Sequence, residues 1–183
     1  MKASLFGLIL VIVAVVAFSC QPQPTTLSEA QKSAIADSAK AVVQLMLSYA
    51  DKLEFGAYFN GYSTDADVRC VENGSLYPSL DSMKRAYAQM QPIMEMMESQ
   101  HNTPDAWNTT VLGTDAVAIT MPYHFSLKPK GLPEYKGQGA WSGIVQRRGG
   151  KWTIIQSHES WVNPEQVMAA LMPPPPKQSR PKK

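Results

Sequence analysis

The feature that most constrains the fold is a series of long β-rich segments in the second half of the chain. Four segments are rich in β-branched and aromatic residues: 109–112, 116–127, 138–148 and 151–160. Turn signals at 113–115 and at Gly149-Gly150 separate two pairs of these segments, which is typical of antiparallel hairpins. The sequence therefore predicts an antiparallel sheet built from long strands.

A long amphipathic helix is predicted at the start of the folded part. Ser28 and Gln31 have the spacing of a capping box, in which each residue satisfies a free backbone amide of the first helical turn. The apolar residues that follow recur at intervals of three and four, so they share one helix face: Ile35, Ala39, Val42, Met46, Tyr49 and Leu53. This face should pack against the sheet.

Two further helices and a hairpin are expected before the long strands. Residues 54–62 predict a short aromatic helix that contains Tyr58, and Asn73-Gly74 predicts a tight hairpin turn. A second amphipathic helix should begin near Ser79, and Pro92 should kink it or end it early because proline lacks a backbone donor. The element order indicates an α+β domain with its helices near the N-terminus.

The first twenty residues predict export and lipidation. Residues 5–18 carry no charge, and their number suits the apolar core of a signal peptide, whereas a membrane span needs about 20 apolar residues. The segment 16–20 resembles a bacterial lipobox, with Ala17 and Ser19 before Cys20. We expect cleavage before Cys20 and a lipid on its thiol. The alternatives are an ordinary signal peptide or a retained anchor.

These signals divide the chain into four parts. We expect a lipoprotein signal peptide at 1–19, a polar tether at 20–27, one globular domain at 28–172 and a proline-rich basic tail at 173–183. The expected location is the cell envelope, lipid-anchored to a bacterial membrane, with the outer membrane or the cell surface favoured. The membrane is then a partner through the lipid on Cys20.

Charge and cysteine content narrow the functional classes. Without Lys2 and the four basic residues of the tail, the formal charge changes from +2 to −3, which gives no reason to expect a nucleic-acid partner. Cys70 lies in an apolar alternation and is expected to be a buried, inert thiol. The three histidines and two cysteines lack the spacing of a zinc site, so we expect no metal and no cofactor.

The turn Gly149-Gly150 predicts a register for the last hairpin. Counted back from a two-residue turn, Trp141 lies opposite His158. One face of the hairpin then collects Trp152, Ile154, His158, Trp141 and Val145. Because successive side chains of a strand alternate, Glu159 should point to the other face.

His158 beside Trp141 is the predicted centre of a pocket. A histidine that titrates near neutral pH can transfer protons, and an aromatic wall would exclude water from it. The other interpretation is a hydrogen-bonded structural histidine at a strand end. The candidate pocket comprises His158, Trp141, Tyr123, Tyr58 and Trp152, and no catalytic residue is assigned.

The last strand pair also resembles a known family. In residues 141–160 a glycine turn is followed by Trp152, the aliphatic pair Ile154-Ile155 and the ending His158-Glu159-Ser160. This pattern, within the element order of residues 30–162, resembles the SnoaL-like branch of the nuclear transport factor 2-like (ketosteroid isomerase-like) superfamily. The resemblance implies a cone-shaped roll, in which a curved antiparallel sheet wraps around two to three N-terminal helices and its open mouth holds a ligand.

Three functions remain open at this point. The first is a binding domain for a small apolar or aromatic ligand, or for a partner at the cell envelope, which ten methionines and many aromatic residues would suit. The second, implied by the resemblance, is an isomerase, cyclase or hydratase with a pocket acid or base, although the family's recurrent aspartate has no matched position here. The third is a structural homodimer formed through the outer sheet.

Overall fold

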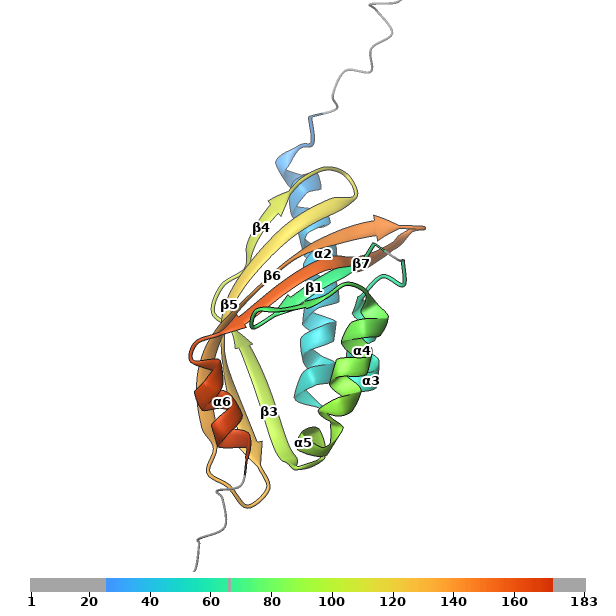
Figure 1. Cartoon of the computed structure of the whole chain (residues 1–183). Helices are drawn as coiled ribbons and strands as arrows, with labels where there is room; N and C mark the ends of the chain where they lie inside the picture. The colour runs from blue at the N-terminus through green and yellow to red at the C-terminus, as the bar shows by residue number, and fades with distance from the viewer. Residues whose placement is uncertain (1–25, 66, 173–183) are drawn as a thin grey trace, which may run out of the picture.

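The computed structural model describes residues 26–65 and 67–172 and consists of one curved sheet wrapped around a long helix (Figure 1). The helices are α2 (Glu29–Asp51), α3 (Phe55–Tyr58), the 3-10 turn η1 (Phe59–Gly61), α4 (Leu80–Gln89), α5 (Gln91–Glu95) and α6 (Pro164–Leu171). The strands are β1 (Arg69–Glu72), β2 (Ser75–Tyr77), β3 (Met97–Pro104), β4 (Asn108–Val111), β5 (Ala116–Pro129), β6 (Tyr135–Arg148) and β7 (Lys151–Trp161).

The strands form a single unclosed sheet in the order β2-β1-β7-β6-β5-β3, with β4 also paired to β5. All pairs are antiparallel except β1 with β7, which run parallel. This architecture confirms the predicted α+β fold with helices inside a curved sheet. The parallel pair was not predicted, because it joins segments far apart in the sequence and no local turn specifies it.

The helices begin and end where the sequence predicts. Ser28 accepts a hydrogen bond from the backbone of Gln31, whose side chain accepts one from the backbone of Ser28, so the capping box is present. The buried face of α2 contains Ala39, Val43, Met46 and Ala50, all at most 4% exposed. The second amphipathic helix breaks at Met90, two residues before Pro92, into α4 and α5.

Strand β3 was missed in the sequence. Its residues Met97–Pro104 read MESQHNTP and include a proline and no aromatic residue, so neither alternation nor β-propensity identifies the segment. It forms because β5 continues past its pairing with β4, which ends at Thr120, and pairs with β3 from Met97↔Pro129 to Pro104↔Tyr123. β3 closes one side of the concave face.

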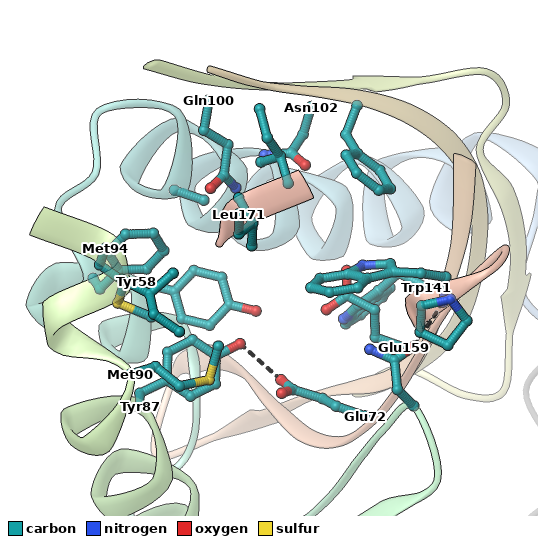
Figure 2. Close-up of a pocket in the computed structure, with 18 of the residues that line it drawn as sticks. Tyr58, Glu72, Tyr87, Met90, Met94, Gln100, Asn102, Trp141, Glu159 and Leu171 are labelled. Atoms are coloured by element: carbon teal, nitrogen blue, oxygen red, sulfur yellow. Dashed lines mark hydrogen bonds between the residues drawn. The ribbon is translucent and has the colours of Figure 1, made fainter. Parts of the chain in front are cut away.

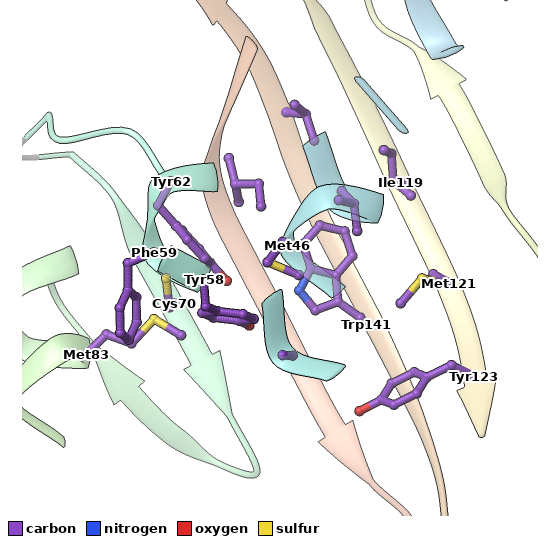
Figure 3. Close-up of a cluster of buried hydrophobic side chains, with 14 of the residues drawn as sticks. Met46, Tyr58, Phe59, Tyr62, Cys70, Met83, Ile119, Met121, Tyr123 and Trp141 are labelled. Atoms are coloured by element: carbon purple, nitrogen blue, oxygen red, sulfur yellow. The ribbon is translucent and has the colours of Figure 1, made fainter. Parts of the chain in front are cut away.

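Aromatic side chains and inward-facing glycines shape the concave face of the sheet. Phe125 lies across Gly137 on the neighbouring strand, and Tyr123 lies across Gly139. A Cβ atom at either glycine would come within 2.9 Å of an aromatic carbon, so only glycine leaves room for the rings. Figure 3 shows the Tyr123 ring in one buried layer with Trp141 and Met121, against Met46 of α2.

The segments at both ends of the chain lie outside the described residues. The expectations for the signal peptide, for Cys20 and most of the tether, and for the tail 173–183 therefore concern residues that the structure does not place. Within residues 26–65 and 67–172, no helix combines the length and the apolar character needed to cross a bilayer.

A glycine substitution tests the packing of the concave face. At Gly143 a Cβ atom would lie 2.5 Å from Trp141 Cη2 and 2.6 Å from the backbone oxygen of Gln156, and the backbone atom cannot move aside as a flexible side chain can. We expect Gly143→Ala to lower the free energy of unfolding by about 1–3 kcal/mol, measured by thermal and urea unfolding. The control is Gly56→Ala in α3, where a Cβ meets nothing within 4 Å. Equal unfolding midpoints for the two variants would contradict this account of the sheet.

Candidate functional site

A cavity of about 640 Å³ lies between the concave face of the sheet and helices α2, α4, α5 and α6. Its wall is mainly aromatic and methionine side chains, to which Phe55, Tyr58, Tyr87, Met90, Met94, Tyr123, Trp141 and Trp161 contribute. Figure 2 shows Tyr58, Tyr87, Met90 and Met94 on one side and Trp141 on the other, with Glu72 between them. A cavity of this size and character suits a ligand of one or two rings.

A β-bulge in the last hairpin decides which side chains of β7 face this cavity. The pairs next to the turn, Arg148↔Lys151 and Val145↔Ile154, follow the register predicted from Gly149-Gly150. The register then shifts, because Ile144 pairs with Gln156 and the extra residue is Ile155. Beyond a one-residue bulge every side chain changes face relative to the simple alternation.

This shift reverses the predicted roles of His158 and Glu159. Trp141 lies opposite Glu159 and not opposite His158, which pairs with Ser142. His158 is exposed on the outer face, so the prediction that it points into the pocket beside Trp141 is wrong. Glu159, expected to point away, lines the cavity.

Glu159 is held in a chain of hydrogen bonds at the cavity wall. The Tyr123 hydroxyl donates to Glu159 Oε1, and the Trp161 indole N–H donates to that same hydroxyl at 3.0 Å. Burial raises the pKa of the Glu159 carboxyl, and the hydrogen bonds from Tyr123 and Trp161 oppose the rise. Burial and the neighbouring Glu159 also hold the pKa of Tyr123 far above its usual range, so Tyr123 remains a proton donor.

Glu72 is the second carboxyl group of the cavity. It is the last residue of β1 and is the direct neighbour of Glu159 across the parallel β1–β7 pair. The Tyr87 hydroxyl of α4 donates to Glu72 Oε1 at 2.9 Å (Figure 2). Burial raises the pKa of Glu72 to about 7, the charge of Glu159 adds to the rise, and the bond from Tyr87 opposes it.

Bonds at both ends of β1 fix the position of Glu72. Beyond its end, Asn73 donates its backbone N–H to the Glu159 carbonyl at 2.9 Å, and its side-chain oxygen accepts from the Trp161 backbone at 2.8 Å. Before its start, Arg148 at the hairpin end donates to Asp67 at 2.9 and 3.0 Å and to Asp65 at 2.6 Å. The guanidinium holds the pKa of both aspartates below their usual range. The aspartates therefore link the segment before β1 to the hairpin end at Arg148. They do not line the cavity.

The arrangement gives the cavity a pair of carboxyl groups that holds a proton near neutral pH. Two neighbouring carboxyls in a partly apolar site do not both ionise readily, because desolvation and mutual repulsion favour the neutral form. A carboxyl whose pKa lies near 7 can both accept and donate a proton under physiological conditions. The site is therefore chemically suited to general acid–base work.

The other predicted pocket residues divide into two groups. Trp141, Tyr123 and Tyr58 line the cavity, and their role in binding stays a prediction. Trp152 does not line it, because it lies near the hairpin turn, at the edge of the core, where Arg147 stacks over its ring at 5.7 Å.

Neither glutamate was predicted from the sequence as a cavity residue, for different reasons. Val68, directly before β1, lies in alternation with Cys70 and Glu72 of that strand, and Val68 and Cys70 are completely buried. A carboxyl group on the apolar face of that strand was therefore a signal that could have been used. No comparable signal exists for Glu159, because the bulge at Ile155 lies in an ordinary β-rich run.

Cys70 is a buried free thiol, as expected, and burial raises its pKa. Among the described residues, no group of three or more His, Cys, Asp and Glu side chains is arranged to hold a metal ion.

Comparison with known proteins identifies the family. A family model described as the SnoaL-like domain matches residues 39–164, which is more than half of the chain. The chain therefore belongs to the SnoaL-like family, as the hairpin motif indicated. No curated protein matches the sequence.

Solved structures share the fold at low sequence identity. A putative dehydratase of the nuclear transport factor 2-like family from Streptomyces avermitilis is 18% identical, with a TM-score of 0.61 over 72% of this chain and 98% of that chain. A putative scytalone dehydratase from Novosphingobium aromaticivorans is 7% identical, with a TM-score of 0.64 over 74% and 89%. A hexachlorocyclohexane dehydrochlorinase (LinA type 2) is 14% identical, with a TM-score of 0.60 over 73% and 89%. These similarities show the fold.

Because of the carboxyl pair, we expect the free energy of unfolding to depend on pH. The pKa of Glu72 is about 7 in the folded protein and 4.5 as an ordinary glutamate, so the unfolded chain loses this proton first as pH rises. The contribution of Glu72 to stability should therefore fall between about pH 4.5 and pH 7 and stay low above that range. Glu72→Gln removes the effect, and we expect its melting temperature to exceed that of the wild type by about 2–6 °C at pH 8.

At pH 4 the same comparison should give nearly equal melting temperatures, because Glu72 is then protonated in both states. The matched control is Glu98→Gln, the same chemical change at an exposed position of β3. A Glu72→Gln gain that is as large at pH 4 as at pH 8 would show that the glutamate carries no buried charge.

Proposed function

We propose that this domain binds a small, mainly apolar molecule in the cavity and transfers a proton to or from it, as an isomerase or a lyase does. The observation that carries the proposal is the pair Glu72 and Glu159, side by side on the cavity wall, with the pKa of Glu72 at about 7. In this proposal Glu72 is the acid or base, because burial and its charged neighbour bring its pKa close to neutral pH. Glu159, fixed by Tyr123, adds to the rise in the pKa of Glu72 that burial causes, and it orients the ligand.

The similar structures support this choice without deciding it. Two of these proteins are named putative dehydratases and one a dehydrochlorinase, and such enzymes remove water or hydrogen chloride from small molecules. Such eliminations need a base close to a carbon-bound proton and a cavity that excludes bulk water. The apolar wall and the carboxyl pair of this chain offer both features.

A non-catalytic binding domain is the second candidate, and one observation favours it. Each carboxyl already accepts a hydrogen bond from a tyrosine, Glu72 from Tyr87 and Glu159 from Tyr123. In a purely binding site these bonds would serve to stabilise the wall and not to move protons. The two candidates differ in whether removing the Glu72 carboxyl abolishes turnover or only alters affinity.

A general substrate for carboxylate bases separates the two candidates. 5-Nitrobenzisoxazole opens to a coloured phenolate when a base removes its ring proton, and it is small enough for the cavity. We expect the wild type to accelerate this reaction, with a rate that rises through about pH 7 as Glu72 loses its proton. Glu72→Gln should reduce the rate by about 100-fold, the typical effect of losing a general base.

The control for this experiment is His158→Ala, which changes an exposed residue on the outer face and should leave the rate within about twofold of the wild type, since surface substitutions are usually mild. Binding is measured separately, by the rise in melting temperature that the compound causes. If the compound binds but Glu72→Gln retains the wild-type rate, Glu72 is not the base, and the binding domain becomes the better description.

The proposed cellular location rests on the first twenty residues of the sequence alone. We propose that the domain is exported and anchored by a lipid on Cys20 to a bacterial membrane, the outer membrane or the cell surface being favoured. The support is the uncharged segment 5–18 followed by the lipobox-like residues before Cys20. The polar tether would hold the cavity in the aqueous layer next to the membrane. A homodimer through the outer sheet stays a prediction.

Metabolic labelling with a fatty-acid analogue tests the anchor. The full chain expressed in a Gram-negative bacterial host should incorporate the label and sediment with membranes, whereas Cys20→Ser should do neither. Cys70→Ala is the control, because Cys70 is buried in the domain and its loss should leave the labelling unchanged. Labelling that persists in Cys20→Ser would contradict lipidation at this residue.

A further inference from the structure

The ionisable groups of the cavity wall are all acidic. Among the described residues that line the cavity, the carboxyl groups are Glu72, Glu159 and Glu165, and no lysine, arginine or histidine is present. Glu165 lies in the first turn of α6 and is exposed, while Glu72 and Glu159 lie deeper, on the sheet. The wall therefore has no positive group to balance an ionised carboxyl pair.

The groups around Glu72 cannot supply that charge either. From each packed element it faces a neutral hydroxyl, a thiol or another carboxyl group: Tyr58, Tyr62, Cys70, Tyr77, Tyr87, Tyr123 and Glu159. Burial raises the pKa of these tyrosines, so they remain uncharged at any physiological pH. A cation that enters from outside would therefore stabilise the pair when both carboxyls are ionised.

The aromatic wall is also suited to a positive charge. Tyr58 and Tyr87 stack with their ring centroids 6.0 Å apart, and Trp141 lies across the cavity from them (Figure 2). The faces of such rings attract an ammonium group, and a carboxylate nearby strengthens the attraction. An anionic ligand would instead meet like charge without any basic partner.

We infer that the natural ligand of this cavity carries a protonated amine on an otherwise apolar, ring-containing body. The ammonium group lies between Glu72 and Glu159 and takes the place of the proton that the pair holds when the cavity is empty. The apolar body packs against the methionines and aromatic rings of α4, α5 and β5. This inference rests on the proposed use of the cavity as a ligand site, and it names the class of ligand.

The affinity of the cavity for a cation should depend on pH. At low pH the carboxyl pair is protonated, so a cation must displace a proton when it binds. As pH rises through about 7 the pair loses that proton, and the affinity for a cation should rise. The affinity for an uncharged ligand of the same shape should not rise over this interval, because no charge compensates the ionised pair.

Three indole compounds with the same ring system and different end groups test this. Tryptamine is a cation, tryptophol is uncharged and indole-3-acetate is an anion near neutral pH. We expect the full chain at pH 8 to bind tryptamine at least about tenfold more tightly than tryptophol, and indole-3-acetate most weakly, as measured by calorimetry. At pH 5.5 the preference for tryptamine should fall to about twofold or less, since the pair is then protonated.

Two variants connect the preference to the carboxyl pair. Glu72→Gln and Glu159→Gln should each abolish the preference for tryptamine while tryptophol still binds, which also shows that the variants are folded. Glu98→Gln on exposed β3 is the control and should keep the preference. Equal binding of tryptamine and tryptophol by the wild type at pH 8, or a preference that survives in both variants, would overturn the inference but leave the cavity as a ligand site. Failure of all three compounds to bind would overturn the proposed ligand site as well.

Discussion

The position of one extra residue in the last hairpin determines the chemistry of the cavity. The bulge at Ile155 moves Ser157, Glu159 and Trp161 to the concave side and puts His158 outside. Because the side-chain period of a strand is two, a single inserted residue exchanges the two faces completely. Without it, the wall opposite Trp141 would carry an imidazole and no carboxyl pair could form. The parallel pairing of β1 then adds Glu72 beside Glu159.

Local patterns in the sequence were sufficient for the helices and for most of the strands, but not for β3 or for the site. The stripe of α2, the break before Pro92 and the first pairs after Gly149-Gly150 follow from periodicity and turn chemistry, which act between residues a few positions apart. The register beyond Ile155 and the pairing of β1 with β7 depend on contacts between distant segments. Trp141, Tyr123 and Tyr58 were placed at the cavity because they lie in the regular part of the pattern.

The carboxyl pair makes the folded domain less stable than apolar residues at the same two positions would. Two partly buried acids without a basic partner disfavour the folded state as soon as the pH allows them to ionise, and apolar residues of similar size would pack there at lower free energy. The tyrosines on either side reduce this penalty without removing it, since a phenol donates a hydrogen bond but brings no positive charge. Such local conflicts with stability are typical of functional positions.

Glu72 depends on bonds that lie outside the cavity. β1 has only four residues, and it is fixed at one end by Asn73 and at the other by the contacts of Arg148 with Asp65 and Asp67. The Arg148 contacts are exposed to solvent and therefore weaken as salt rises. A change in ionic strength therefore acts on the anchoring of the strand that carries Glu72, although no salt ion needs to enter the cavity.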